Sequence, residues 1–374
     1  MSRQNIAILL DSAPITWTSQ EDRHLKLCEV LVKRGNQPLL VFSEKLSPEF
    51  AARLRNTGAE LVAINYGEGT THYLRELRKL VKKHSINMAH IIFFDSFSAV
   101  PWIARLAGIT NIIYEMQNSG VFQATSWRKS LLQLRTRLMT SPTTRVIAIS
   151  EFVKEQLVKG GLAENKIVVR YLGVDTERFV PDSSARKYWA SEFNLGPDET
   201  VLSTVSYLRP FKNPQVLVQT CRELARRNVR ARLFVAGDGE MLPGLKELSR
   251  QLGVAERIHW LGNVPDPKSL LQASDIFVLA SIGEAFGLVL AEAMACGVPI
   301  VGSRSGSLPE VVDEGRTGLL AAPLDSNSFA ESIERLAKDP NLRRKMGSKA
   351  LEHVRERFTV RKAVEETIRI YDSL

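Results

Sequence analysis

Short apolar runs recur along the chain, and each is followed by a polar loop and then by apolar residues at helical spacing. In the first cycle, residues 5–10 predict a buried strand, residues 22–33 predict a helix that Gly35 ends, and residues 38–42 predict the next strand. Further strands are predicted at 60–64, 89–94, 111–114, 145–149 and 166–170. Because strands alternate with helices, the first half should form a mostly parallel sheet covered on both faces.

A second cycle of the same kind begins near residue 200. It predicts strands at 200–205, 231–236, 258–261, 276–279, 299–302 and 318–321. Two α/β domains are therefore expected, at 1–176 and 177–356, joined by a polar stretch that contains Pro181 and Pro197.

The segment 357–374 has apolar residues at helical spacing, namely Val360, Ala363, Val364, Ile368 and Tyr371. We expect it to form a helix that packs back across the interface between the domains. Two doubly wound, parallel-sheet domains that face each other would enclose a cleft. Ligands of such sheets bind at the carboxyl ends of the strands, so the loops that follow strands are the candidate sites.

Composition narrows the class of protein. The chain of 374 residues is long enough for two domains, and its apolar fraction of 44% is ordinary for a globular protein. None of its apolar runs approaches the roughly 18 residues that span a bilayer, and we expect no secretory signal. Cys28, Cys221 and Cys296 lie far apart, with no CxxC motif, which disfavours disulfides and zinc and predicts a cytoplasmic location.

Charge is unevenly distributed along the chain. Residues 1–175 contain 23 Lys and Arg against 15 Asp and Glu, whereas the rest is nearly neutral. A basic first half suggests an anionic partner such as a membrane surface, a phosphorylated acceptor or nucleic acid, and a solvated basic surface without a partner is the alternative. Nucleic acid is disfavoured because we find no basic stretch interleaved with aromatic residues on a known module.

The most informative loop follows the predicted strand 276–279 and reads Ser281-Ile-Gly-Glu-Ala-Phe-Gly-Leu-Val-Leu-Ala-Glu-Ala-Met-Ala-Cys-Gly297. We expect a helix from near Phe286 to Gly297, whose free first-turn N–H groups point into the cleft and can bind phosphate. Gly287 has no side chain to obstruct a diphosphate that approaches the backbone.

Two glutamates frame this loop and helix. Glu292 can accept hydrogen bonds from two neighbouring hydroxyls, such as those of a ribose, and Glu284 lies in the loop itself. From spacing alone, Glu284 could equally be a helix-dipole partner and Glu292 a surface residue.

The surrounding sequence adds context. One stretch resembles the donor motif of retaining family-4 glycosyltransferases. It consists of Glu284, seven intervening residues and Glu292, followed by Ala-Met-Ala-Cys-Gly-Val-Pro. Further stretches resemble the family in order: Val146-Ile-Ala-Ile-Ser-Glu-Phe-Val-Lys154, Gly173-Val-Asp-Thr-Glu-Arg-Phe-Val-Pro181, Phe234-Val-Ala-Gly-Asp-Gly-Glu240, Trp260-Leu-Gly-Asn-Val264, Ala273-Ser-Asp-Ile-Phe-Val-Leu279 and Gly306-Ser-Leu-Pro-Glu310. The resemblance spans nearly the whole chain and is strongest after residue 146.

This resemblance implies a GT-B fold, with two Rossmann-like domains, and a metal-independent, retaining transfer of a hexosyl unit from a UDP- or GDP-sugar. It implies that Glu284 contacts the donor sugar and Glu292 holds the ribose. Backbone amides of Phe286, Gly287 and Leu288 would meet the diphosphate, and Gly262 and Asn263 would lie at the base. No cofactor and no metal ligands are expected, and no Asp-x-Asp motif occurs.

The phosphates also need cations, and here the chain departs from the family. The loop after strand 200–205 reads Ser206-Tyr-Leu-Arg-Pro-Phe-Lys212, where the family usually has Gly-Arg-Leu and a later Lys. Lys212 matches that Lys, and Tyr207 stands where the Arg is usual. We therefore hypothesise that Arg209 makes the phosphate contact, because its planar fork can grip two oxygens; a solvent-facing Arg209 is the alternative.

The first domain departs further. The loop after the first strand, residues 11–19, lacks the family's glycine pair, and Gln117 stands near the place of a His that contacts the donor sugar. A Gln can form hydrogen bonds but cannot titrate. His90 is expected to be structural, and Asp95, which follows a strand, is a candidate for the acceptor site.

Two basic amphipathic stretches, 74–83 and 127–139, could lie on anionic lipid, although the apolar face of such a helix is more often core. We therefore expect a glycan or lipid-linked acceptor, made for cell-envelope glycans, polysaccharides or glycolipids, and a cytoplasmic protein that can sit peripherally on the membrane. The alternatives are a GT-B epimerase or phosphorylase and a non-catalytic sugar-binding relative.

Overall fold

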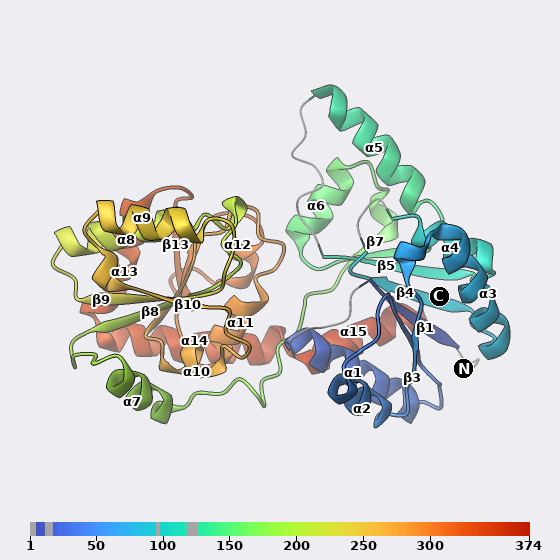
Figure 1. Ribbon diagram of the computed structural model, residues 1–374, viewed down its shortest axis with the longest axis horizontal. Helices are drawn as coiled ribbons and strands as arrows, with labels where there is room; N and C mark the ends of the chain where they lie inside the picture. The colour runs from blue at the N-terminus through green and yellow to red at the C-terminus, as the bar shows by residue number, and fades with distance from the viewer. Residues whose placement is uncertain (1–4, 12–17, 95–97, 118–125) are drawn as a thin grey trace. The chain divides into compact units, whose positions relative to one another are not determined.

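The computed structural model describes residues 5–11, 18–94, 98–117 and 126–374. The chain forms two compact units (Figure 1). Unit 1 contains Met1–Tyr171 and Arg361–Leu374, and unit 2 contains Leu172–Val360. The C-terminal segment therefore belongs to the first unit.

Unit 1 is built on a parallel sheet of seven strands in the order β3-β2-β1-β4-β5-β6-β7. The strands are β1 (Ile6–Leu10), β2 (Leu39–Phe42), β3 (Glu60–Ala63), β4 (Met88–Ile92), β5 (Asn111–Met116), β6 (Arg145–Ala148) and β7 (Ile167–Val169). The central strands β1 and β4 are buried along their whole length, and all their residues except His90 are apolar, as is typical of a parallel sheet covered on both faces.

Helices cover both faces of this sheet (Figure 1). They are α1 (Ser19–Lys33), α2 (Pro48–Arg55), α3 (Thr70–His84), α4 (Val100–Ala107), α5 (Ser126–Thr140), α6 (Glu151–Lys159) and α15 (Val360–Asp372). α1, α2 and α15 lie on one face, and α3 packs beside α4 on the other.

Unit 2 has a parallel sheet of six strands in the order β10-β9-β8-β11-β12-β13. Its strands are β8 (Thr200–Val205), β9 (Ala231–Ala236), β10 (Ile258–Gly262), β11 (Ile276–Leu279), β12 (Ile300–Ser303) and β13 (Gly318–Ala321). Its helices are α7 (Ser183–Glu192), α8 (Pro214–Arg226), α9 (Leu242–Gln251), α10 (Lys268–Ala273), α11 (Leu288–Ala295), α12 (Leu308–Val311), α13 (Ser326–Lys338) and α14 (Pro340–Arg357). α8, α9 and α13 cover one face, whereas α10, α11 and α14 cover the other.

The predicted α/β fold class is confirmed, and each predicted strand is present with ends that differ by at most two residues. Two helix starts were predicted wrongly. α1 begins at Ser19, three residues early, because the Thr18 side chain and Glu21 form a capping box. α11 begins at Leu288 rather than near Phe286, because Gly287 adopts φ = 82° and cannot belong to the helix.

Candidate functional site

In the sheet of unit 2 the order of the strands reverses between β8 and β11: the chain adds β9 and β10 on one side of β8 and β11 to β13 on the other. Ligands of doubly wound sheets bind at such a switch point, outside the carboxyl ends of the strands. Lys212 lies on the loop after β8, and Glu284 lies on the loop after β11. Their side chains meet across this point: the Lys212 Nζ is 2.7 Å from the Glu284 Oε2, and the side chains are only 19% and 13% exposed. Two of the predicted catalytic residues are thus brought together from distant parts of the sequence.

Backbone contacts hold these loops against each other. The Ile282 N–H donates to the Phe211 carbonyl at 2.7 Å, and the Ser307 N–H donates to the Glu284 carbonyl at 2.9 Å. At Gly306, where φ is 63°, an added Cβ would overlap the backbone nitrogen of Glu284. Only glycine fits this approach, so the loop after β12 fixes the backbone of Glu284.

The loop after β8 is fixed in the same way by the loop after β9. The Leu208 side chain is fully buried, and its N–H donates to the Asp238 carbonyl at 2.9 Å. A Cβ on Gly237 would overlap the Ser206 carbonyl oxygen. Because buried Leu208 separates them, Tyr207 and Arg209 both extend into solvent.

Arg209 lies against an aromatic ring. Its guanidinium carbon is 4.9 Å from the centre of the Tyr207 ring, and Tyr207 is 64% exposed. Likewise, the Lys212 ammonium lies 5.2 Å from the centre of the Phe211 ring. Both predicted phosphate-binding cations therefore rest on neighbouring aromatic faces.

The start of α11 offers unsatisfied amides. Within the described residues, the Leu288 and Val289 N–H groups have no hydrogen-bond partner, as expected for the first turn of a helix. The Phe286 side chain is buried and packs edge-on against Phe358 at 5.5 Å, so only its backbone could face a ligand.

The other predicted donor residues belong to the same unit. Glu292 is on α11 and is 5% exposed. Gly262 ends β10 with φ = 67°, and its carbonyl accepts a hydrogen bond from the Gly237 N–H. Asn263 is exposed beside it. The ligand contacts assigned to these residues remain predictions.

In unit 1, Gln117 directly follows β5, at the carboxyl edge of the sheet. Its Nε2 donates to the Glu115 Oε1 at 2.6 Å, and its Oε1 accepts from the Gln20 Nε2 at 3.1 Å. Asp95, the predicted acceptor residue, lies outside the described residues.

Glu115 is the centre of a buried polar cluster that sequence reasoning missed. It is 1% exposed, and its Oε2 pairs with the Arg23 Nη1 at 2.9 Å and with the Arg170 guanidinium. His90 lies 3.3 Å from the same oxygen and 2.7 Å from the Tyr371 hydroxyl, contacts that fit the structural role expected of it. The available signal in the sequence was an acidic residue among the apolar and aromatic residues 112–116.

Burial raises the pKa of Glu115, but the Arg170 and Arg23 guanidiniums more than offset this and hold its pKa well below the usual range. Burial lowers the pKa of Arg170 to about 10, although Glu115 favours its charged form. Burial also lowers the pKa of His90 and of the neighbouring His24. The cluster therefore contains one carboxylate, two guanidiniums and neutral imidazoles near neutral pH.

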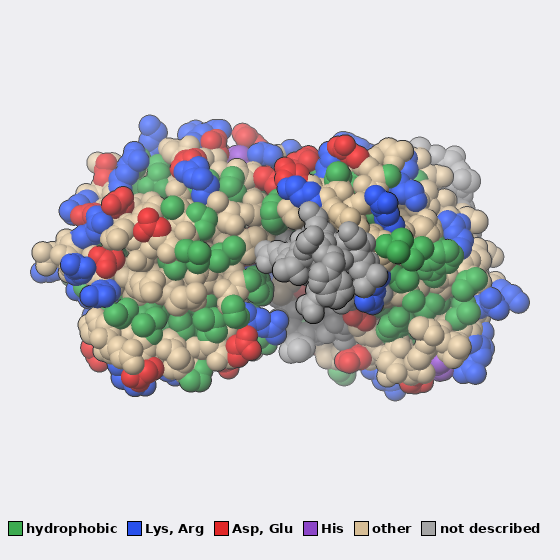
Figure 2. All heavy atoms as spheres, turned by 90° about the horizontal axis from the view of Figure 1, so that it is seen from above, with side chains coloured by type: hydrophobic (Ala, Val, Ile, Leu, Met, Phe, Trp, Pro, Cys, Tyr) green, Lys and Arg blue, Asp and Glu red, His purple; other side chains and the backbone are tan. Residues whose placement is uncertain are grey.

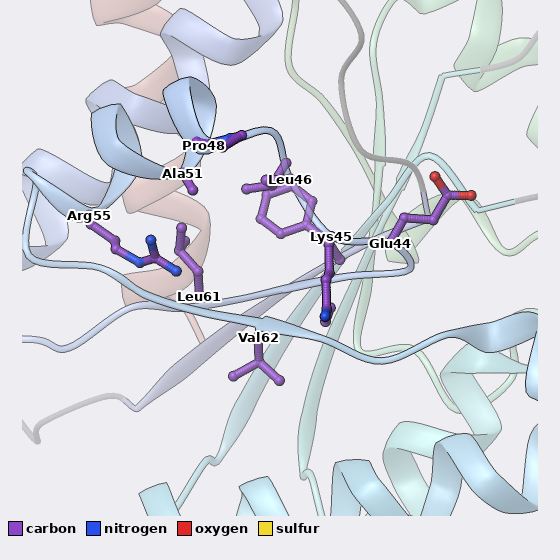
Figure 3. Close-up of a pocket in the computed structure, with 10 residues that line it drawn as sticks. Glu44, Lys45, Leu46, Pro48, Ala51, Arg55, Leu61 and Val62 are labelled. Atoms are coloured by element: carbon purple, nitrogen blue, oxygen red, sulfur yellow. The ribbon is translucent and has the colours of Figure 1, made fainter.

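A separate hollow of about 410 Å³ lies at the free edge of the unit 1 sheet, between α2 and β3 (Figure 3). Its wall is mainly apolar, and Lys45 and Arg55 border it, whereas Glu44 points away from the other labelled side chains. It is formed by the edge strand and lies apart from the Glu115 cluster in the strand order.

Comparisons with known proteins define the class. The crystal structure of Anabaena Alr3699/HepE in complex with UDP and glucose superimposes with a TM-score of 0.83, over 99% of this chain and 100% of that chain, at 20% identity. Two doubly wound domains of this kind are the GT-B fold. The family model "Glycosyltransferase Family 4" matches residues 23–178, and "Glycosyl transferases group 1" matches residues 186–353. The chain belongs to the family-4 glycosyltransferases, as the motifs predicted.

Two curated relatives illustrate the family. The N-acetyl-alpha-D-glucosaminyl L-malate synthase of Bacillus anthracis is 38% identical over 180 residues, which cover 48% of this chain and 47% of the relative. The D-inositol 3-phosphate glycosyltransferase of Actinosynnema mirum is 31% identical over 279 residues, 68% of this chain and 65% of the relative. The chain thus spans about half to two thirds of the length of these relatives.

Proposed function

We propose that this protein is a retaining glycosyltransferase that moves a hexosyl unit from a UDP- or GDP-sugar to a hydroxyl acceptor. The observation that carries the proposal is the Lys212–Glu284 pair at 2.7 Å. The pair lies at the point where the strand order reverses, and the loop that holds Glu284 leads to the free first-turn N–H groups of α11. A nucleoside diphosphate needs positive charge and amide donors at this place, and a sugar needs a fixed acceptor for its hydroxyls.

The chemistry follows from these groups. Lys212, Arg209 and the α11 amides stabilise the negative charge that grows on the departing diphosphate. Lys212 also fixes the Glu284 carboxylate, which accepts hydrogen bonds from donor-sugar hydroxyls. The acceptor hydroxyl attacks from the face that the diphosphate leaves, and its proton passes to a phosphate oxygen of the donor. Because these steps use cations of the protein itself, we propose that no divalent metal and no other cofactor is required.

Turnover of UDP-, GDP-, ADP- and TDP-sugars, with and without EDTA, tests this function directly. We expect hydrolysis or transfer with a UDP- or GDP-sugar that EDTA leaves unchanged. Release of sugar phosphate from a glycan with free phosphate would support a phosphorylase, and a changed sugar on an intact nucleotide would support an epimerase. Binding without turnover of any donor would support a non-catalytic relative.

Arg209 provides a second test. Arg209→Ala should lower kcat/KM by about 10–100-fold, because it removes one cation from the departing diphosphate. Tyr207→Phe keeps the ring that supports the guanidinium and should stay within about threefold of the wild type. The matched control is Arg250→Ala, which removes an arginine that is 64% exposed on α9. Normal turnover by Arg209→Ala would show that Arg209 is only a solvent-facing residue.

We propose a glycan or lipid-linked acceptor that carries negative charge, as in cell-envelope glycan, polysaccharide or glycolipid synthesis. The basic first half of the chain supports an anionic partner. The names of the two relatives point the same way, since malate and inositol 3-phosphate are both anionic and bear hydroxyls.

Unit 1 also presents a surface suited to anionic lipid. Among the described residues, no helix is both long and apolar enough to cross a membrane. The apolar face of α3 is core, because Tyr73, Leu77 and Val81 are buried. However, Trp102 and Leu106 of α4 and Leu134 and Leu138 of α5 are between 39% and 58% exposed.

These four apolar side chains form a continuous patch with the cations of α3. The Trp102 Nε1 donates to the Leu138 carbonyl at 2.7 Å, and the Arg78 Nη2 donates to the Leu106 carbonyl at 2.8 Å. Arg75, Lys79 and Lys82 line the same side of α3 as Arg78. Hydrophobic side chains flanked by Lys and Arg are visible on unit 1 in Figure 2. Such a surface favours peripheral binding to an anionic bilayer.

We expect the protein to sediment with vesicles that contain phosphatidylglycerol, and less so as salt concentration rises. Replacing Leu134 and Leu138 together with Ser should weaken this binding by about tenfold, because two exposed apolar side chains lose their contact with lipid. The control replaces exposed Leu324 of unit 2, which is 62% exposed, with Ser. Equal sedimentation with neutral and with anionic vesicles would contradict the proposal.

A further inference from the structure

The orientation of the Gln117 amide is fixed by charged groups on both sides. Gln117 and Gln20 exchange two hydrogen bonds, of 3.1 and 3.3 Å, and either amide could in principle be turned over. Glu115 can only accept, so the Gln117 Nε2 must face its Oε1 at 2.6 Å. Arg23 can only donate, so the Gln20 Oε1 must face its Nη2 at 3.3 Å.

Both N–H bonds of the Gln117 amide are therefore used within the protein, one on Glu115 and one on Gln20. Its oxygen accepts one hydrogen bond, from Gln20, and has a second lone pair for which the described residues provide no donor. Gln117 is half-buried at the carboxyl edge of β5, where ligands of such sheets bind. It can thus offer a ligand an acceptor and no donor.

The Glu115 carboxylate and the two guanidiniums that fix the orientation of the Gln117 amide keep their charges near neutral pH. The titratable and charged groups around Glu115 come from four other parts of unit 1. They are Arg23 and His24 of α1, His90 of β4, Arg170 after β7 and Tyr371 of α15. Burial lowers the pKa of both histidines and raises the pKa of the Tyr371 hydroxyl, so these three groups stay neutral. The two guanidiniums keep Glu115 ionised.

We infer that Gln117 binds a substrate hydroxyl through its amide oxygen, and that Glu115 is the positioning residue that keeps this oxygen, rather than the NH₂ group, available; the inference rests on the proposed sugar transfer. The ligand class is a neutral group with an O–H to donate. A substrate group that can only accept, such as a carboxylate, a phosphate or a fluorine in place of the hydroxyl, finds no donor at Gln117.

Gln117→Glu tests this orientation through a pH profile. In its protonated form the introduced carboxyl resembles the amide, because its O–H donates to Glu115 and its carbonyl oxygen stays free. Ionisation places two carboxylates side by side, which raises the pKa of the introduced carboxyl and repels it from Glu115. We expect kcat/KM of Gln117→Glu to fall by about tenfold as pH rises from acidic to neutral, relative to the wild-type profile.

Two further variants complete the experiment. Gln117→Met keeps the volume without the oxygen, and its kcat/KM should be about tenfold lower at every pH. It should also lose the wild-type discrimination against one monodeoxy analogue of the substrate. The control is Gln251→Glu, because the Gln251 Nε2 likewise donates to a carboxylate, Glu247 Oε1 at 3.1 Å, but on the exposed surface of α9. Its pH profile should match the wild type.

The outcomes separate the two proposals. If wild-type protein transfers sugar but Gln117→Glu follows the wild-type pH profile, or Gln117→Met keeps full kcat/KM, the role of Gln117 is wrong and the proposed function stands. If wild-type protein transfers sugar from no donor, both proposals fall. Thermal stability of each variant, measured alongside, separates loss of activity from loss of fold.

Discussion

Replacing Lys212 with Ala should lower kcat/KM for sugar transfer by about 10²–10³-fold, the usual cost of losing one preorganised electrostatic partner of a transition state. Lys212 has two tasks in the proposed mechanism, because it faces the departing diphosphate and also holds Glu284 at 2.7 Å. Its removal leaves Glu284 without its ion-pair partner, at a place mostly shielded from solvent, and takes one of the two proposed cations from the diphosphate. Steady-state kinetics with the preferred nucleotide-sugar measures the effect.

Lys246→Ala is the matched control, since Lys246 is an exposed lysine on α9 of the same unit. Its kinetics should stay within about twofold of the wild type, as expected for a surface charge. Activity of Lys212→Ala within about threefold of the wild type would contradict the assignment of this pair as the donor site.

Glu115→Leu should destabilise unit 1 by about 3–5 kcal/mol, because it leaves two guanidiniums buried without their carboxylate. Arg23 and Arg170 are 3% and 0% exposed, so water cannot replace the lost partner. Hydrogen exchange of the amides in β1, β4 and β5 measures this free energy of opening. The control is Glu314→Leu, which breaks an Arg304–Glu314 pair with side chains 52% and 43% exposed and should cost about 1 kcal/mol or less.

The same carboxylate predicts a pH dependence of stability. The pKa of Glu115 in the folded protein lies well below its ordinary value of 4.5, so the stabilising contribution of this group is fully present above that pH. The contribution is lost as pH falls from 4.5 through the lower folded pKa. Wild-type unit 1 should therefore lose stability in acid more steeply than Glu115→Leu. Parallel slopes for the two proteins would show that Glu115 is not ionised in the folded state.

The strands were predictable because each is a short apolar run bounded by turn residues, and burial on both faces demands that pattern. The first residues of α1 and α11 were not predictable. They depend on a capping box at Thr18 and on the left-handed backbone of Gly287. A one-dimensional pattern does not report which of several polar or glycine residues takes the capping conformation.

The candidate site likewise contains residues that the sequence allowed us to propose and residues that only the structure reveals. Lys212 and Glu284 could be proposed from the sequence because each lies in a stretch that resembles a motif of the family. The Glu115 cluster could not be proposed, because its members come from α1, β4, β5, the segment after β7 and α15, and their contacts span up to 281 positions. Only the fold determines that such distant charges meet, so Gln117 could be named from the sequence while the group that orients it could not.

The return of the last residues to unit 1 has a consequence for biosynthesis. Unit 2 is one continuous segment, Leu172–Val360, inserted between the two parts of unit 1. All residues of unit 2 are therefore synthesised before Tyr371, a contact partner of His90 in unit 1. Until α15 is added, the first unit lacks the Tyr371 hydroxyl that contacts His90 and the apolar side chains that α15 buries. A fragment of residues 1–171 should consequently be less stable than unit 1 of the full chain, whereas a fragment of residues 172–360 contains every residue of its unit.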